Sequence, residues 1–260
     1  MANPEDHRLA RELADGAGVL LLELRERLVA EGAEPRAIKE AGDRAAHELL
    51  VARLAADAPG DAVLSEEARE DERLDTARLS AARVWIVDPL DGTREYGEGR
   101  DDWAVHVALV EGGRPTAGAV ALPGLGTTLA TDDPPTVPPA PVRLRVIVSR
   151  TRPPKEALAI ADALGAELVE MGSAGAKAMA IVRGVADVYP HSGGQYEWDS
   201  CAPVAVASAA GLHCSRLDGA PLVYNRPDPA LPDLLICRPE HAEAAIAAAA
   251  ALDDAAGGGA

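Results

Sequence analysis

The chain has 260 residues, 48% hydrophobic and 26% charged, which is ordinary for a globular protein with a buried core. Its formal net charge of -17 repels polyanions, which argues against binding to a nucleic-acid polymer or an anionic membrane. A small phosphorylated substrate is compatible with this charge only where basic side chains or bound metal ions neutralise it locally.

The cysteines, the histidines and the apolar runs indicate whether to expect disulfides, a zinc site, export or a membrane span. The three cysteines form no CxxC pair, and the six histidines form no HxH or HExxH pair, so neither a disulfide framework nor a zinc site is expected. The first residues, MANPEDHRL, lack the basic start and apolar run of an export signal. The apolar run from Ala244 to Leu252 is too short to span a bilayer. We therefore expect a cytoplasmic protein without a membrane partner.

The first half of the chain is predicted to form two helices followed by strands. Apolar residues recur at helical spacing from His7 to Val29 and again from about Gly42 to Ala56. The segment 59–72 is then turn-rich and acidic around the short apolar run 62–64, and the run at 83–88 predicts a buried strand. Further runs separated by glycine-containing turns predict an antiparallel meander of strands at 103–113, 114–124 and 126–131.

The proline-rich segment 131–141 is predicted to be an extended linker. It would join an N-terminal α+β subdomain, residues 1–130, to a C-terminal α/β subdomain, residues 142–260. Strands and helices alternate in this second part, which favours a layered α/β fold. The predicted strands are 144–149, 166–171, 186–190 and 233–237, and the predicted helices are 153–164, 173–184, 199–211 and 239–252.

The stretch VWIVDPLDGTREY places two aspartates at the end of a predicted strand. Asp88 ends the strand and Asp91 follows after a Pro-Leu step, at a position where ligands commonly bind in α/β sheets. Gly92 and Thr93 would begin a turn or helix whose backbone N–H groups can receive a phosphate oxygen. Because aspartates also cap turns routinely, the motif alone leaves a turn and a metal site about equally open.

Other acidic residues have ordinary explanations when each is considered alone. Glu66 and Glu67 lie 22 and 21 residues before Asp88 and would be exposed loop charges, while Asp199 would cap a helix. Asp43 would be a helix surface charge. The D-x-D-G-T signature of haloacid-dehalogenase phosphatases does not fit, because two residues separate the aspartates here and 87 residues precede the first.

Taken together and in order, these residues resemble a known signature. Asp43, the pair Glu66-Glu67, DPLDGT and Trp198-Asp199 are similar to the motifs of the magnesium-dependent, lithium-sensitive phosphomonoesterases related to inositol monophosphatase. The resemblance covers roughly residues 5 to 250. It implies an α/β fold built as a layered α+β sandwich, in the order αβαβα.

Three further segments, each less specific than the metal motif, indicate a subgroup within this family. VSRTR (148–152), GSAGAK (172–177) and ADVYPHSGGQYEWDSCAP (186–203) are similar to CysQ-type 3'(2'),5'-bisphosphate nucleotidases. That group removes the 3'-phosphate from adenosine 3',5'-bisphosphate in sulfur assimilation. The resemblance thus implies a small nucleotide bisphosphate as substrate, with the 5'-phosphosulfate analogue as a second candidate, and a homodimer as a common assembly of the family.

The resemblance also implies a role for each motif residue. Two or three Mg²⁺ ions would be held by the metal ligands, which are Glu66, Asp88, the Leu90 carbonyl, Asp91 and Asp199. Asp43 and Thr93 would orient and deprotonate the attacking water, and Glu67 would support the metal site without contacting the ions. The implied substrate-binding residues are Gly92, Thr93, Ser149, Arg152, Ser173 and Lys177. Considered alone, Ser173 and Lys177 could equally be a helix-capping serine and a solvated lysine.

Two other functions stay open on the sequence. An inositol-1-phosphate or fructose-1,6-bisphosphate phosphatase would share the same metal core. A non-catalytic regulator that binds metal or nucleotide would keep the carboxylates but would not need Thr93 and Asp43. His106 is expected to be structural, and Cys201 is expected to be a small core residue.

Overall fold

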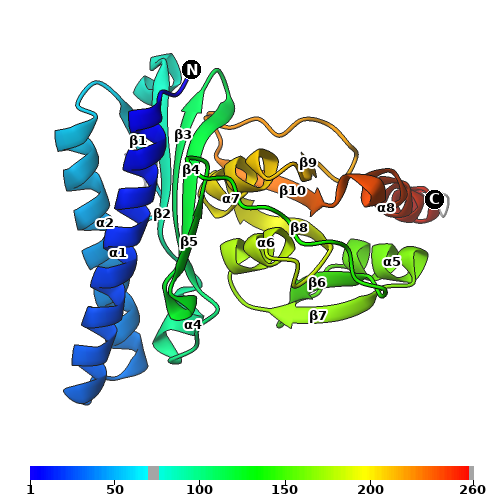
Figure 1. The fold of residues 1–260 in the computed structure, drawn as a ribbon, viewed down its shortest axis with the longest axis horizontal. Helices are drawn as coiled ribbons and strands as arrows, with labels where there is room; N and C mark the ends of the chain where they lie inside the picture. Colours follow the sequence, from blue (N-terminus) through cyan, green and yellow to red (C-terminus); the bar gives the residue numbers. More distant parts are fainter. Residues whose placement is uncertain (70–75, 258–260) are drawn as a thin grey trace.

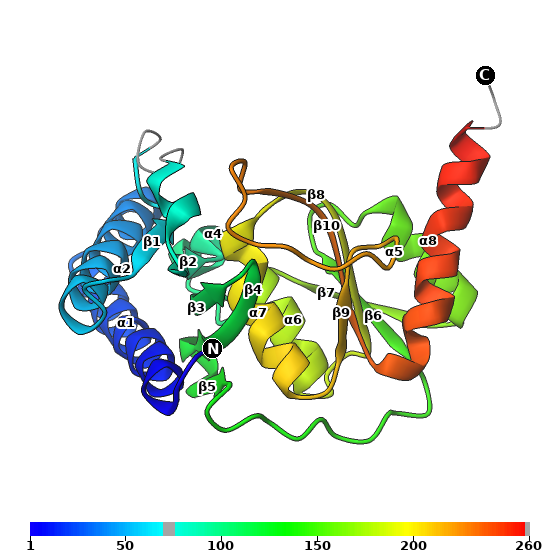
Figure 2. The same cartoon turned by 90° about the horizontal axis from the view of Figure 1, so that it is seen from above.

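The computed structural model describes residues 1–69 and 76–257 and consists of five stacked layers. Figure 2 shows their order, which is a helix pair, a sheet, a second helix pair, a second sheet and a third helix pair. The predicted layered αβαβα fold is confirmed. None of the helices in these two described ranges is both long and apolar enough to cross a membrane.

The outer helices α1 (Pro4–Ala30) and α2 (Pro35–Asp57) cover one face of the first sheet (Figure 1). Asn3 caps α1 in a capping box with Asp6, which satisfies backbone N–H groups at the start of the helix. Helix α2 starts seven residues before the predicted Gly42. The earlier start follows from Pro35 in the first turn, whose fixed φ suits a helix start, and from Ile38, which is buried against the core.

The first sheet has the strand order β1-β2-β3-β4-β5. Strand β1 (Ala62–Ser65) was predicted as part of a turn-rich segment, but parallel pairing with β2 (Arg83–Asp91) makes it a strand. The remaining strands form the predicted antiparallel meander. These are β3 (Ala104–Glu111), β4 (Arg114–Leu122) and β5 (Thr127–Ala130). Short helices precede or connect the strands: η1 (Thr76–Ser80), which was not predicted, α4 (Thr93–Gly97) and η2 (Pro123–Leu125).

The second sheet is mixed, with the order β7-β6-β8-β10-β9. Strands β6 (Arg145–Ser149), β7 (Glu167–Met171) and β8 (Val188–Tyr196) are parallel where they pair, and β10 (Ala230–Cys237) is antiparallel to both β8 and β9 (His213–Ser215). Strand β8 extends six residues beyond the predicted Pro190. Pairing with β10 keeps the polar, glycine-rich segment HSGGQY in the sheet, although that segment has no apolar alternation.

Four helices flank the second sheet. Helices α5 (Lys155–Leu164) and α8 (Ala242–Gly257), with the short η3 (Pro239–His241), cover its outer face. Helices α6 (Ala174–Val182) and α7 (Glu197–Ala209) form the central layer between the two sheets. The N-terminus of α6 lies beside Asp91 at the end of β2, and α7, whose first turn carries Asp199, begins directly after β8.

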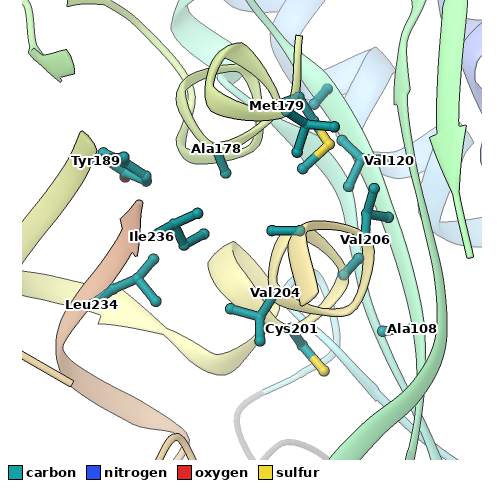
Figure 3. Packing of buried hydrophobic residues seen from close by; sticks show 14 of the residues in the cluster. Ala108, Val120, Ala178, Met179, Tyr189, Cys201, Val204, Val206, Leu234 and Ile236 are labelled. Carbon is teal, nitrogen blue, oxygen red and sulfur yellow. The ribbon is translucent and has the colours of Figure 1, made fainter. Parts of the chain in front are cut away.

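The central layer is packed with small and medium apolar side chains (Figure 3). Met179 and Val206 face Val120 of the first sheet, while Val204 and Ala178 face the second sheet. A fully buried Val, Leu, Ile or Met side chain contributes roughly 1.5–3 kcal/mol through burial, so this layer binds the two sheets firmly together. Cys201 is buried within it, as expected of a small core residue.

The proline-rich segment 131–141 crosses from β5 to β6 as a mostly extended chain (Figure 2). Both sheets nevertheless pack against α6 and α7 in one hydrophobic cluster. The division into subdomains 1–130 and 142–260 joined by this linker stays a prediction.

Candidate active site

An irregularity in β2 brings Asp88 and Asp91 to the same face of the first sheet. Asp88 pairs with His106 and Asp91 with Ala104, so two residues of β2, Pro89 and Leu90, lie opposite the single Val105 of β3. Residues three apart in a regular strand point to opposite faces, and the extra residue of a bulge reverses that relation. Both aspartates therefore point toward the central helices.

The Asp91 carboxylate is held by the N-terminus of α6. It accepts hydrogen bonds from the backbone N–H of Ala174 at 3.1 Å and of Gly175 at 2.6 Å, and from the hydroxyl of Ser173. Ser173 caps the helix, since its Oγ also accepts from the N–H of Ala176 at 3.0 Å. The helix N-terminus carries partial positive charge, which stabilises the carboxylate in a fixed orientation.

Asp199 approaches from the first turn of α7. The prediction that it caps a helix needs correction, because the N-cap is Tyr196 and Asp199 occupies the third helical position, where it accepts the Tyr196 N–H at 2.6 Å. The result is a cluster in which one carboxylate oxygen from each of Asp88, Asp91 and Asp199 lies within 4.8 Å of the others.

Glu66 joins this cluster electrostatically. It follows β1, and its backbone N–H donates to the Val87 carbonyl at 3.3 Å, directly before Asp88. Burial, followed by the charges of Glu66, Asp91 and Asp199, raises the pKa of Asp88 well above its usual value. Burial and Asp91 likewise raise the pKa of Asp199 to about 8. The cluster therefore has an excess of negative charge that favours bound protons or a cation.

The cluster fits a hard divalent cation. Asp88 Oδ2 is buried and has no hydrogen-bond partner within residues 1–69 and 76–257, although buried carboxylate oxygens are normally paired. Carboxylate and carbonyl oxygens are the ligands that Mg²⁺ prefers, and a metal bound here would satisfy that oxygen and offset the mutual repulsion.

Thr93 and Asp43 lie beside this cluster. The Thr93 hydroxyl is 3.2 Å from Asp43 Oδ1 and 3.0 Å from the Leu90 carbonyl oxygen, and both of these oxygens are acceptors. Burial, followed by the charge of Glu67, raises the pKa of Asp43 to about 7. Glu67 is exposed but close enough to affect Asp43. Helices α2 and α4 thus bring together residues 50 positions apart.

The predicted substrate residues have different surroundings. Lys177 is buried, not solvated, and its ammonium donates to the Ser173 carbonyl at 2.6 Å. Arg152 is exposed, and after burial the charges of Lys177 and Arg152 lower the pKa of His191 to about 4. Ser149 is half-buried, with its hydroxyl 3.4 Å from that of Thr151. Gly92 has a φ of +88°, a conformation open to glycine, and precedes the five-residue helix α4.

An ion-pair network near α6 was not anticipated. Asp102 accepts from the Gly172 N–H at 2.8 Å and pairs with Arg150, which also contacts Glu95. The hydrogen bond from Gly172 to Asp102 therefore fixes the backbone immediately before Ser173. Arg150 lies within the segment VSRTR, but spacing alone does not distinguish it from the exposed Arg152.

The family model described as the inositol monophosphatase family matches residues 4–254. The chain belongs to the inositol monophosphatase family. This family member is 52% identical over 251 residues to the 3'-phosphoadenosine 5'-phosphate phosphatase of Mycobacterium leprae (strain TN), an alignment covering 91% of this chain and 90% of that protein. It is also 52% identical over 244 residues to the protein of the same name from Mycobacterium tuberculosis (strain CDC 1551 / Oshkosh), covering 90% and 89%.

A solved structure supports the same family assignment. CysQ from Bacteroides thetaiotaomicron, described as a bacterial member of the inositol monophosphatase family, superposes with a TM-score of 0.73 at 26% identity. The match covers 90% of this chain and 97% of that one. The family prediction drawn from Asp43, Glu66, DPLDGT and Asp199 is therefore confirmed.

Proposed function

We propose that this protein is a Mg²⁺-dependent phosphatase that removes the 3'-phosphate from adenosine 3',5'-bisphosphate and releases AMP. The observation that carries the reaction type is the convergence of Asp88, Asp91 and Asp199 beside the Thr93–Asp43 pair. The substrate is supported by the names of the mycobacterial relatives at 52% identity. The 5'-phosphosulfate analogue is a second candidate substrate.

The proposed metal ligands are Glu66, Asp88, Asp91, Asp199 and the Leu90 carbonyl. Two or three Mg²⁺ ions bound by these oxygens would polarise the substrate phosphate and lower the pKa of a bound water. Asp91 is held by α6 and Asp199 by the Tyr196 N–H, so both carboxylates are oriented before any ligand arrives. This rigidity avoids the cost of ordering the ligands on binding.

Thr93 and Asp43 are proposed to handle the proton of the attacking water. A general base is most effective when its pKa lies near the working pH, and in the metal-free chain burial raises the pKa of the Asp43 carboxyl to about 7. The Thr93 hydroxyl can accept a hydrogen bond from the water while it donates to Asp43. A passive metal-binding regulator would have no use for this pair.

The substrate phosphate and nucleoside are proposed to lie between Gly92 and the region around Lys177 and Arg152. The charges of Lys177 and Arg152 both lower the pKa of His191, so this region carries positive charge within a strongly acidic protein. Because Ser173 and Lys177 already donate to protein oxygens, we propose that they act mainly by holding Asp91 and α6 in place. Ser149 stays a predicted substrate contact.

Removal of the Thr93 hydroxyl tests the proton-handling role. Thr93→Ala is expected to lower kcat by about a hundredfold or more, the scale of general-base catalysis, with little change in the KM for substrate. Thr93→Ser, which keeps the hydroxyl, should retain most of the activity. Phosphate release measured at saturating Mg²⁺ checks this. Equal activity of the alanine and serine variants would exclude a catalytic role for the hydroxyl.

A panel of substrates tests the proposed function as a whole. Adenosine 3',5'-bisphosphate, its 5'-phosphosulfate analogue, inositol 1-phosphate and fructose 1,6-bisphosphate are compared by kcat/KM with Mg²⁺, with chelator and with added Li⁺. We expect the nucleotide bisphosphate to be preferred at least tenfold over inositol 1-phosphate, and chelator and Li⁺ to inhibit. Preference for inositol 1-phosphate would reject the nucleotidase assignment. Turnover indifferent to chelator would reject the metal-dependent mechanism.

A cytoplasmic location and a homodimer complete the proposal. The location rests on the three cysteines, which are unpaired in the structure and suit a reducing compartment. The dimer rests on the family resemblance alone, and both statements stay predictions.

A further inference from the structure

His106 occupies a position that no proposed catalytic role explains. It lies on β3 directly opposite Asp88 and is fully buried on the face that meets α6 and α7. Its Nδ1 is 2.9 Å from the carbonyl oxygen of Trp198. Because a carbonyl oxygen only accepts, this contact places a proton on Nδ1, which donates to the first turn of α7 immediately before Asp199.

The opposite edge of the ring faces α6. Nε2 lies 3.4 Å from Asp91 Oδ2 and has no hydrogen-bond partner within the described part of the chain. It is also so close to the backbone of α6 that a Cβ on Gly175 would come within 1.9 Å of it. Gly175 is the residue whose N–H donates to Asp91 at 2.6 Å.

We infer that His106 is a positioning residue that sets the separation between Asp91 and Asp199. The Nδ1 edge of the ring is hydrogen-bonded to the turn of α7 that carries Asp199. The Nε2 edge packs against the turn of α6 that orients Asp91. Because the planar ring is rigid and lies between the two turns, it keeps the turn that orients Asp91 at a fixed distance from the turn that carries Asp199. The inference rests on the proposed metal site and assigns His106 no contact with metal or substrate.

This role differs from ordinary core packing in what a substitution should change. A residue that only fills space affects the folding stability and leaves the spacing of the carboxylates as it was. A positioning residue affects the metal affinity, because groups that orient metal ligands typically alter that affinity by about 10- to 100-fold. Val120 provides a matched packing control, since it pairs with His106 across β3 and β4 and is equally buried.

Mg²⁺ binding, measured by isothermal titration calorimetry on the metal-free full-length chain, tests the inference independently of turnover. We expect His106→Leu to weaken Mg²⁺ binding at least tenfold. His106→Asn, whose side-chain N–H can replace Nδ1–H toward Trp198 but which is too short to reach α6, should weaken Mg²⁺ binding less than His106→Leu does. Val120→Ala should lower the melting temperature but bind Mg²⁺ like the wild type.

A second variant keeps the test decisive where His106→Leu fails to fold. Gly175→Ala leaves His106 in the chain but displaces its ring, and it too should weaken Mg²⁺ binding at least tenfold. Unchanged binding in His106→Leu or Gly175→Ala, or equal weakening in Val120→Ala, would overturn the positioning role. A wild type that binds no Mg²⁺ would instead overturn the proposed metal site and, with it, this inference.

Discussion

Asp91→Asn is expected to reduce the kcat for phosphate release by at least about a hundredfold, more than the loss of a group that only orients a ligand. The substitution removes a carboxylate from the centre of the acidic cluster and weakens its attraction for a divalent cation. The amide oxygen of the new side chain can still accept from the N–H of Gly175, but its NH2 group then faces the N–H of Ala174, so the start of α6 loses one hydrogen bond and keeps the others. Phosphate release at several Mg²⁺ concentrations, together with circular dichroism, measures both effects.

Asp162→Asn is the matched control for this prediction. It makes the same chemical change on an exposed position of α5 and should leave kcat and Mg²⁺ dependence unchanged. Turnover in Asp91→Asn equal to that of the control would show that the cluster does not take part in catalysis. Loss of the helical spectrum in Asp91→Asn would assign the effect to folding.

The second large effect is a pH-dependent stabilisation by Mg²⁺. Without metal, the pKa of Asp43 is raised from 3.8 to about 7 and that of Asp199 from 3.8 to about 8 in the folded chain. The folded chain therefore retains protons that the unfolded chain loses above about pH 4, so its stability falls as the pH rises toward 8. Mg²⁺ competes with those protons and binds best when the carboxylates are ionised.

We therefore expect saturating Mg²⁺ to raise the melting temperature by about 5 °C or more at pH 8 and by clearly less at pH 5.5. Differential scanning calorimetry at matched ionic strength makes the comparison. Asp199→Asn removes one of the shifted carboxylates and should flatten the pH dependence of the metal-free chain between pH 6 and 8. A stabilisation by Mg²⁺ that is equal at both pH values would contradict the expected competition with protons.

Local patterning was sufficient for most of the secondary structure. Apolar patterning predicted α1, the strand β2, the meander β3 to β5 and the alternating strands and helices after the proline-rich segment. The unpredicted strand segments have a common cause, since β1, the glycine-rich half of β8 and the short β9 depend on pairing partners distant in the chain. The early start of α2 instead follows from Pro35 and the burial of Ile38. Pairing with β10 stabilises polar segments as strands despite their low intrinsic preference.

The order and chemistry of the motif residues were sufficient to recognise the family, because Asp43, Glu66, DPLDGT and Asp199 retain their identity and order whatever the surrounding fold. Composition and charge likewise indicated that an acidic chain needs cations at any phosphate site. These properties belong to the residues themselves, and they can be read in a linear chain.

The shape of the site arises only in the folded chain. The bulge in β2 turns Asp88 and Asp91 to the same face, the N-terminus of α6 orients Asp91, and α2 brings Asp43 to Thr93. Burial then gives His106 a place between two helices and makes Lys177 an internal donor in place of a solvated charge. These features depend on contacts between segments far apart in sequence, so they cannot be predicted from the spacing of residues along the chain.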